Sequence, residues 1–326
     1  MNQLSAIIVG LGDQSLNDHV PTLLRRNDVK IVGACDPSIN AQHDFNRKFP
    51  ELEDKVTLAE DLDELLRTVQ PDFAVVAVPH NRYMEIVTSL CQQQLYFLKE
   101  KPLARNLVEA NAILSIPGFA KYGFTATQRR YGEIYQQAKN SIGSLGNLYM
   151  FHAVYKLNID APHESWRGIK ATSGGGCLID MGYHLVDQLV WWFGMPQRIH
   201  AQISALAVPN AHYDAEDSAT VLFRYNSGLH GTLLVSRAAG EKYEGYELYG
   251  SNGYMVGSKK QVTFFNRRGD VVQEISQPDG QILLDAQLDF FISRIISKVG
   301  FADLQQDHLN NMKLIQRCYD DALAES

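Results

Sequence analysis

The stretch that decides the fold is Leu4–Ser15, which reads Leu-Ser-Ala-Ile-Ile-Val-Gly-Leu-Gly-Asp-Gln-Ser. A short apolar run leads directly into Gly10 and Gly12. Glycines at this point allow a tight turn and let a pyrophosphate approach backbone N–H groups. Ser15 stands at the third position of a G-x-G-x-x-G pattern, and Pro21 falls inside the expected following helix. A plain glycine turn is therefore the alternative interpretation.

Asp36 favours the nucleotide interpretation. It follows the apolar run 29–35, at a position where a carboxylate can accept hydrogen bonds from an adenosine ribose. The alternative is a simple turn residue in Asp36-Pro37. The glycine turn and Asp36 together predict dinucleotide binding.

Short apolar runs alternate with helical stretches in the first third of the chain, which is typical of a parallel sheet covered by helices. The expected strands are 4–9, 29–35, 73–78, 95–98 and 122–126, and the expected helices are 39–49, 59–69, 82–93 and 106–115. After residue 127 we expect a helix over 131–141, a strand from 148, a helix over 177–193, strands from 199, and helices over 282–299 and 303–324. Ser251-Asn252-Gly253 is typical of a type I′ hairpin. The layout is an α/β half, residues 1–127, followed by an α+β half, residues 128–326.

Composition indicates a soluble globular protein of about two domains, because 45% of the 326 residues are hydrophobic and only 21% are charged. The four cysteines, Cys35, Cys91, Cys177 and Cys318, form no C-x-x-C pair and no cluster with histidine. We therefore expect neither a disulfide framework nor a metal site, and a reducing cytoplasm as the location.

The charge and hydropathy patterns exclude several other classes. The net charge is −7 and no basic face is visible, which argues against nucleic acid as a partner. No apolar run approaches the 18 or more residues of a membrane span, and the start of the chain has no secretory signal pattern.

The stretch 174–193 carries polar residues on a very apolar helix. Asp180 and His184 are four residues apart, so they share one face of a continuous helix, and Asp187 extends that stripe. Because the other sides are apolar, the helix must be buried, and the stripe must be paired internally or line a cleft. A satisfied core pair is the alternative to catalysis. The preceding Gly174-Gly175-Gly176 suggests a backbone that another group approaches closely.

Glu100-Lys101-Pro102 follows the expected strand 95–98, at the carboxyl edge where open α/β sheets bind ligands. A solvated lysine is the alternative interpretation of Lys101.

The ordered motifs resemble the glucose-fructose oxidoreductase, inositol dehydrogenase and rhizopine catabolism family over essentially the whole chain. They are Gly10-x-Gly12, Asp36-Pro37, Glu100-Lys101-Pro102, Gln128-Arg129-Arg130, Trp166-Arg167, Gly174-Gly175-Gly176 and Asp180-x-x-x-His184. The resemblance implies a Rossmann domain that holds NAD or NADP. It also implies a substrate-binding and oligomerisation domain with a large open, mainly antiparallel sheet, through which homodimers or homotetramers pack.

The resemblance also implies roles for single residues. Lys101, Asp180 and His184 are the implied catalytic residues, with His184 as proton acceptor; Lys101 as the acceptor is the alternative. The implied cofactor-binding residues are Gly10, Gly12, Asp13, Gln14, Asp36, Val78, Pro79, Glu100, Lys101 and Gln128. The implied substrate-binding residues are Lys101, Tyr155, Trp166, Arg167, Asp180 and His184, with His152 and His163 as further candidates against polar strand faces as the alternative. Ser15, Tyr83 (where a His is common) and Gln94 depart from the family pattern but leave the catalytic residues intact.

The expected function is hydride transfer between a nicotinamide and a secondary alcohol or ketone of a sugar, polyol or cyclitol. NAD is expected over NADP, because Asp36 would repel a 2′-phosphate. The alternatives are a dinucleotide-binding regulator without turnover and a sugar-processing enzyme that restores its NAD within each turnover. The joint presence of Lys101, Asp180 and His184 favours an enzyme. Val262, Phe264 and Tyr249 are candidate contacts between subunits.

Overall fold

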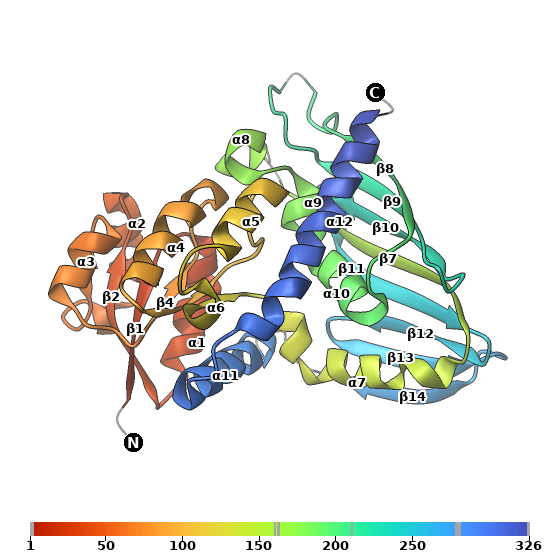
Figure 1. Cartoon of the computed structure of the whole chain (residues 1–326), viewed down its shortest axis with the longest axis horizontal. Helices are drawn as coiled ribbons and strands as arrows, with labels where there is room; N and C mark the ends of the chain where they lie inside the picture. The colour runs from red at the N-terminus through yellow and green to blue at the C-terminus, as the bar shows by residue number, and fades with distance from the viewer. Residues whose placement is uncertain (1–2, 160, 162–163, 210, 278–281, 325–326) are drawn as a thin grey trace. The chain divides into compact units, whose positions relative to one another are not determined.

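The computed structural model describes residues 3–159, 161, 164–209, 211–277 and 282–324 (Figure 1). The chain divides into two compact units. The first contains Met1–Ala104, Val108–Ala126 and Leu284–Gln305, and the second contains Arg105–Leu107, Thr127–Leu283 and Gln306–Ser326. The expected boundary between residues 127 and 128 therefore differs from the contact-defined one, chiefly because 284–305 packs with the first unit.

The first unit contains a six-stranded sheet in the order β3-β2-β1-β4-β5-β6. All neighbouring strands are parallel. The strands are β1 (Leu4–Val9), β2 (Val29–Cys35), β3 (Thr57–Ala59), β4 (Phe73–Val76), β5 (Tyr96–Lys99) and β6 (Gly123–Thr125). The order reverses beside β1, which is the doubly wound Rossmann arrangement predicted from the sequence.

Helices enclose this sheet, and all four residues of β4 are buried. Burial on both faces explains why the strands are apolar runs and do not alternate between apolar and polar residues. The helices of this unit are α1 (Val20–Leu24), α2 (Ile39–Lys48), α3 (Leu62–Thr68), α4 (Tyr83–Gln92), α5 (Leu107–Leu114), α6 (Phe119–Tyr122) and α11 (Ile282–Ser297).

Aromatic packing explains why α11 belongs to the first unit. Phe291 is fully buried, and its ring centroid lies 5.4 Å from that of Phe73 on β4 and 5.7 Å from that of Phe124 on β6. Composition alone did not reveal this attachment, because the contacts join segments more than 160 residues apart.

The second unit contains an eight-stranded sheet in the order β14-β13-β12-β11-β7-β10-β9-β8. Its strands are β7 (Leu148–Asn158), β8 (Arg198–Ser204), β9 (Ser218–Arg224), β10 (His230–Ser236), β11 (Ala238–Gly250), β12 (Gly253–Ser258), β13 (Gln261–Asn266) and β14 (Val271–Ser276). Only the pairing of β7 with β10 is parallel, and the other neighbours are antiparallel. The predicted α+β class with a large, mainly antiparallel sheet is confirmed.

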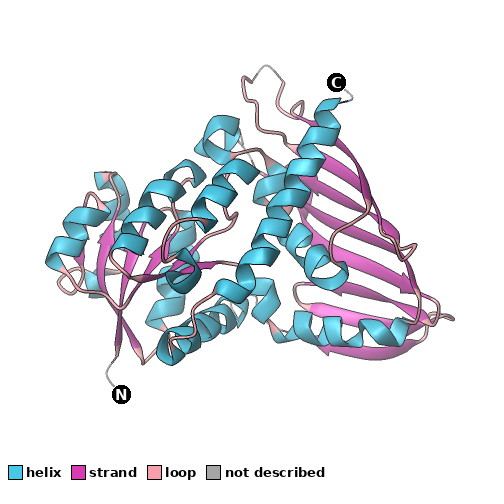
Figure 2. Ribbon diagram, in the orientation of Figure 1, coloured by secondary structure: helices cyan, strands magenta, loops and turns pink. Residues whose placement is uncertain are grey.

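Helices cover one face of this sheet (Figure 2). They include α7 (Glu133–Ser141), α10 (Tyr183–Phe193) and α12 (Gln305–Ala324), and the short helices α8 (Lys170–Ser173) and α9 (Cys177–Asp180) belong to the same unit. Buried and more exposed residues alternate along β9, as a sheet with one covered face requires. Val262 and Phe264 are buried, so neither is available as a subunit contact, whereas Tyr249 is half-buried.

Three local predictions are wrong. The region expected as one helix over 59–69 contains the end of β3 before α3 begins at Leu62. The helix expected over 177–193 is interrupted at Met181-Gly182, where Gly182 N donates to Cys177 O and a Cβ on Gly182 would lie 2.5 Å from Leu178 O.

The third wrong prediction is the type I′ turn of the β11–β12 hairpin, although the hairpin itself forms at the predicted place. A type I′ turn needs positive φ at both central residues, Ser251 and Asn252, and neither has it. Instead, the Ser251 and Asn252 amides donate to Asn147 O and Leu145 O, which fixes the turn against the preceding segment.

Candidate functional site

The parallel sheet brings four predicted motifs to one edge of the first unit. β1, β2, β4 and β5 are adjacent and parallel, so their carboxyl ends face the same way. Gly10, Asp36, Val78-Pro79 and Glu100-Lys101 follow these four strands. The topology therefore gathers the predicted cofactor residues of this unit at the edge where α/β sheets bind ligands.

The two glycines of the turn after β1, Gly10 and Gly12, have different surroundings. Gly10 has φ +90°, and a Cβ there would lie 2.4 Å from Ala77 O, so the fold itself requires glycine. A Cβ on Gly12 would meet nothing within 4 Å, so the open space beside Gly12 is compatible with a ligand that approaches the backbone. Ser15, at the third glycine position, is buried and its Oγ donates to Gly10 O at 2.5 Å.

The sequence after Ser15 forms a π-helical turn, Ser15–His19, before α1. Pro21 is the second residue of α1 and lies two residues after the π-helical turn, inside a stretch that is helical over 13–24. The π-helical turn interrupts the regular hydrogen-bond pattern next to the residue that lacks an N–H, so the helix tolerates the proline. Asp13 is exposed and Gln14 is half-buried, with Gln14 Nε2 donating to Asp18 at 2.8 Å.

Asp36 is half-buried and braces the turn from β2. Its Oδ2 accepts from Leu11 N at 2.8 Å, and its Oδ1 accepts from Ser38 N at 2.9 Å. A carboxylate can accept about four hydrogen bonds. The turn role and a ribose-binding role are therefore compatible.

Glu100 is buried and points to the π-helical turn, where His19 Nε2 lies 2.9 Å from Glu100 Oε1. Burial by itself would raise the pKa of Glu100, but the hydrogen bond and charge of His19, with the nearby Lys101 and Lys99, lower it below its ordinary value. Lys101, the next residue, is half-buried, and so are Val78 and Pro79 after β4.

In the second unit, the three glycines before α9 are required by the protein itself. Gly174 has φ +88° and a Cβ there would lie 2.3 Å from Arg105 O. A Cβ on Gly175 would lie 2.0 Å from Tyr319 Oη, and one on Gly176 would lie 1.8 Å from Glu216 O. The close approach predicted from the glycines is thus made by the chain's own segments.

Glu216, which sequence reasoning missed, fixes the beginning of α9. Its buried carboxylate accepts from Gly176 N at 2.7 Å, Leu178 N at 2.9 Å and Tyr319 Oη at 2.9 Å. Burial raises the pKa of Glu216 in spite of these bonds. No spacing pattern marked it, because it contacts α9 from 40 residues away.

The predicted polar stripe separates into two parts. Asp187 is buried and is a structural residue: Arg130 donates to it from Nε at 2.9 Å and from Nη2 at 2.8 Å, and Asn311 Nδ2 donates at 2.6 Å. In the fully described stretch 175–190, Asp180 and His184 are the two residues that are not buried. Asp187 therefore fits the core-pair alternative, whereas Asp180 and His184 are half-buried.

Asp180 contacts Arg167, a predicted substrate residue, and Arg167 in turn contacts Trp166, another one. Arg167 Nε is 3.3 Å from Asp180 Oδ2, and the Arg167 guanidinium lies 4.5 Å from the centroid of the Trp166 ring. Tyr155 is buried on the covered face of β7. Burial, followed by the charges of Glu244 and Asp180, raises the pKa of Tyr155 to about 12.

His152 and His163, the further substrate-binding candidates, are not part of this group as the structure describes it. His152 is exposed on the opposite face of β7 from Tyr155, and its Nδ1 lies 2.5 Å from Thr232 Oγ1 on β10, so it does not join this group. His163 lies outside the described residues.

A charge cluster near Tyr155 was also missed; the side chains of Arg129 and Glu244 are buried, and Lys259 is half-buried. Arg129 forms an ion pair with Glu244, and Lys259 Nζ lies 3.1 Å from the other oxygen of Glu244. The adjacent Gln128, a predicted cofactor residue, is half-buried, and its Oε1 atom has no hydrogen-bond partner among the described residues. The three cluster residues come from separate segments, so spacing gave no signal.

Within the described part of the chain, no group of three or more His, Cys, Asp or Glu residues could hold a metal ion. The helices of that part also lack the combination of length and hydropathy needed to cross a membrane.

The fold and the motif-bearing edge define an oxidoreductase with an NAD-binding Rossmann domain. Residues 4–117 match the family model described as "Oxidoreductase family, NAD-binding Rossmann fold", and residues 135–256 match "GFO/IDH/MocA C-terminal domain". The chain belongs to the Gfo/Idh/MocA family, as its motifs had indicated.

Curated relatives share limited sequence identity with the chain. It is 24% identical over 199 residues to D-glucoside 3-dehydrogenase of Escherichia coli (strain K12), covering 59% of this chain and 55% of that protein. It is 26% identical over 178 residues to rhizopine catabolism protein MocA of Rhizobium meliloti, covering 53% of this chain and 55% of that protein. The chain thus spans little more than half the length of these relatives.

Solved structures match the fold over its whole length. A levoglucosan dehydrogenase in complex with NADH and levoglucosan has a TM-score of 0.87 at 17% identity, covering 100% of this chain and 98% of that one. Myo-inositol 2-dehydrogenase from Lactobacillus plantarum has a TM-score of 0.82 at 22% identity, with the same coverage. At these identities the likeness establishes the fold.

Proposed function

We propose that the protein is an NAD-dependent dehydrogenase or reductase of a secondary alcohol or ketone in a sugar, polyol or cyclitol. The observation that carries the proposal is the edge of the first unit, where Gly12, Asp36 and Lys101 follow parallel strands of one sheet in a member of an oxidoreductase family. The open space at Gly12 and the remaining acceptor capacity of Asp36 fit a dinucleotide. The sugar and inositol dehydrogenases among its relatives support the substrate class.

The chain's own residues supply binding and proton transfer in this proposal. NAD supplies the hydride-accepting group. The hydroxyl proton of the substrate must leave during oxidation, and a neutral imidazole is well suited to accept it near pH 7, which we assign to His184. Asp180 hydrogen-bonds the substrate or orients His184, and Lys101 stabilises the negative charge that develops on the oxygen.

The accessibility of Asp180 and His184 supports this assignment. They alone are not buried within 175–190, and neither accepts the Arg130 and Asn311 hydrogen bonds that fix Asp187. The substrate side of the proposal also uses Arg167, which contacts Asp180, and Trp166, whose ring packs on Arg167.

The test is NADH fluorescence from purified protein with NAD and a panel of sugars, polyols and cyclitols. On a substrate that is turned over, His184→Ala and Lys101→Ala should each lower turnover by about 10²-fold to 10⁴-fold and leave NAD affinity nearly unchanged. His43→Ala, an exposed histidine on α2, is the control and should retain turnover. Turnover of His184→Ala within about threefold of wild type would contradict the role of His184.

The same assay separates the proposal from its alternatives. NAD binding without conversion of any panel compound would favour a regulator. Conversion of a substrate without net NADH would favour a sugar-processing enzyme that restores its NAD in each turnover.

A further inference from the structure

Lys99 is a fully buried lysine that the proposed chemistry does not use. It is the last residue of β5, and its exposed fraction is 0%. Lysine is almost never completely buried, because its amine loses water and must find hydrogen-bond acceptors inside the protein. The other three residues of β5 are Tyr, Phe and Leu, so an apolar residue at position 99 would suit the strand pattern equally well.

The Lys99 amine contacts the backbone on both sides of Lys101. Its Nζ donates to Glu100 O at 2.8 Å and to Pro102 O at 2.6 Å. The carbonyl between them, Lys101 O, accepts from Tyr83 Oη at 3.3 Å. Three successive carbonyl groups are therefore held by two side chains.

Tyr83 also holds the Lys99 amine. Lys99 Nζ lies 3.8 Å from the centroid of the Tyr83 ring, which is the geometry of a cation–π contact, and Tyr83 is 1% exposed. Tyr83 begins α4 and stacks on His80, with 5.6 Å between ring centroids. Burial lowers the pKa of Lys99 well below its ordinary value of 10.5. Each of the two carbonyls accepts one N–H group of the amine.

We propose that Lys99 is a positioning residue for Lys101. Together with Tyr83, it fixes the backbone of residues 100–102 and thereby sets where the Lys101 side chain begins. The consequence for turnover rests on the proposed function of Lys101, whereas the fixing of the backbone does not.

The decisive variant is Lys99→Met, which keeps an unbranched side chain but removes the donor. A matched control is Thr125→Val. Thr125 pairs with Lys99 on the neighbouring strand β6, is 1% exposed, and its Oγ1 atom has no hydrogen-bond partner among the described residues. Both variants replace a buried polar group with an apolar one, but only Lys99→Met frees the carbonyls beside Lys101.

The first readout is amide hydrogen exchange over residues 100–104, which requires no substrate. We expect exchange to be about tenfold faster or more in Lys99→Met and unchanged in Thr125→Val, because local opening governs exchange. Tyr83→Phe removes one of the three bonds and should give a smaller acceleration in the same segment. If Lys99→Met does not fold, the exchange rate of Tyr83→Phe over residues 100–104 tests the proposal. The proposal would be overturned if folded Lys99→Met or Tyr83→Phe exchanged residues 100–104 at the wild-type rate. It would also be overturned if the control Thr125→Val accelerated exchange there as much as Lys99→Met.

The second readout is turnover on any compound that the panel identifies. A misplacement of about 1 Å can cost about 10²-fold in rate, so Lys99→Met should lose about tenfold to 10²-fold in kcat while NAD affinity changes by less than about threefold. Wild-type turnover in Lys99→Met, together with a large loss in Lys101→Ala, would overturn the positioning role. Full turnover in Lys101→Ala would instead contradict the proposed function, and the exchange result would still decide whether Lys99 fixes the segment.

Discussion

Asp36 combines a structural contact and a proposed binding contact in one carboxylate. It accepts from Leu11 N and Ser38 N, and we propose that it also accepts from the ribose hydroxyls of NAD. A 2′-phosphate would place like charges together, so wild-type protein should bind NAD at least about tenfold more tightly than NADP, a difference of about 1.4 kcal/mol.

The measurement is the dissociation constant for each cofactor in wild type and in Asp36→Ala, which should reduce the difference. Ser38→Ala is the control, because it removes the hydroxyl that caps α2 but keeps the carboxylate. Equal affinity of wild type for NAD and NADP would refute this discrimination.

Glu100 should make stability depend on pH in the acid range. Its pKa in the folded protein is lower than the ordinary 4.5, because the contribution of His19 and the neighbouring lysines exceeds that of burial. A lowered pKa means that the stabilisation is present above about pH 4.5 and is lost as the pH falls through the folded value.

Urea unfolding of wild type and Glu100→Gln between pH 7 and pH 3.5 measures this dependence. The difference in unfolding free energy should decrease as the pH falls below about pH 4.5. A difference that grows as the pH falls below about pH 4.5 would show that the sign is wrong.

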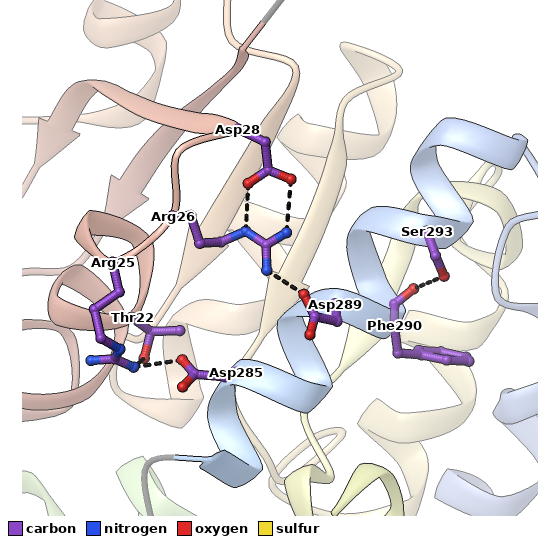
Figure 3. Close-up of polar contacts among 8 residues, drawn as sticks. All are labelled: Thr22, Arg25, Arg26, Asp28, Asp285, Asp289, Phe290 and Ser293. Atoms are coloured by element: carbon purple, nitrogen blue, oxygen red, sulfur yellow. Dashed lines mark hydrogen bonds and ion pairs between the residues drawn. The ribbon is translucent and has the colours of Figure 1, made fainter. Parts of the chain in front are cut away.

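The attachment of α11 to the Rossmann sheet has an ionic and an apolar part. Arg25 Nη2 lies 2.5 Å from Asp285, and Arg26 contacts Asp289 while also binding Asp28 through two nitrogens at 2.8 Å (Figure 3). Asp285 and Asp289 have side chains that are 40% and 65% exposed, so each pair contributes about 0–1 kcal/mol. Burial of Phe291 should therefore contribute more than these ion pairs to the free energy that holds α11 against the sheet.

We therefore expect Phe291→Ala to lower the free energy of unfolding by about 3–5 kcal/mol, and Asp289→Asn by less than about 1 kcal/mol. Chemical denaturation of the two variants provides the comparison. A larger loss in Asp289→Asn than in Phe291→Ala would mean that the ion pairs, and not the aromatic packing, hold α11.

Sequence reasoning predicted elements that depend on local patterns and failed for contacts between distant segments. The bounds of β1 and β2 agree with the prediction, because burial on both faces leaves continuous apolar runs. The break at Gly182 was not predicted; one of the groups that leaves no room for a side chain there, Val235 on β10, is distant in the sequence. Asp187 and Asp180 belonged to one predicted stripe, and the positions of Arg130 and Asn311, both distant in the sequence, make Asp187 the buried structural residue. The expected strand 95–98 stopped one residue before Lys99, and its burial at the end of β5 was not predicted.

At the scale of the whole molecule, the uncovered face of the eight-stranded sheet is the feature that bears on assembly. Leu222 on β9 and Leu234 on β10 are 48% and 36% exposed. Three rings form a ladder across β11, β12 and β13, with 5.6 Å between the centroids of Tyr249 and Tyr254 and 4.7 Å between those of Tyr254 and Phe265. Exposed apolar side chains on one uncovered sheet face are compatible with a protein interface.

We propose that a second copy of this chain covers that face, so the protein should self-associate. Light scattering at micromolar concentration should give a multiple of the 36.6-kDa chain mass, because the exposed apolar area is removed from water in the assembly. Leu222→Glu should shift the mass toward the single chain while NAD binding is retained. Val108→Glu is the matched control, since Val108 is a 79% exposed apolar residue on α5. A wild-type mass of 36.6 kDa would contradict self-association. An assembly unaffected by Leu222→Glu would mean that the copies contact each other through another surface.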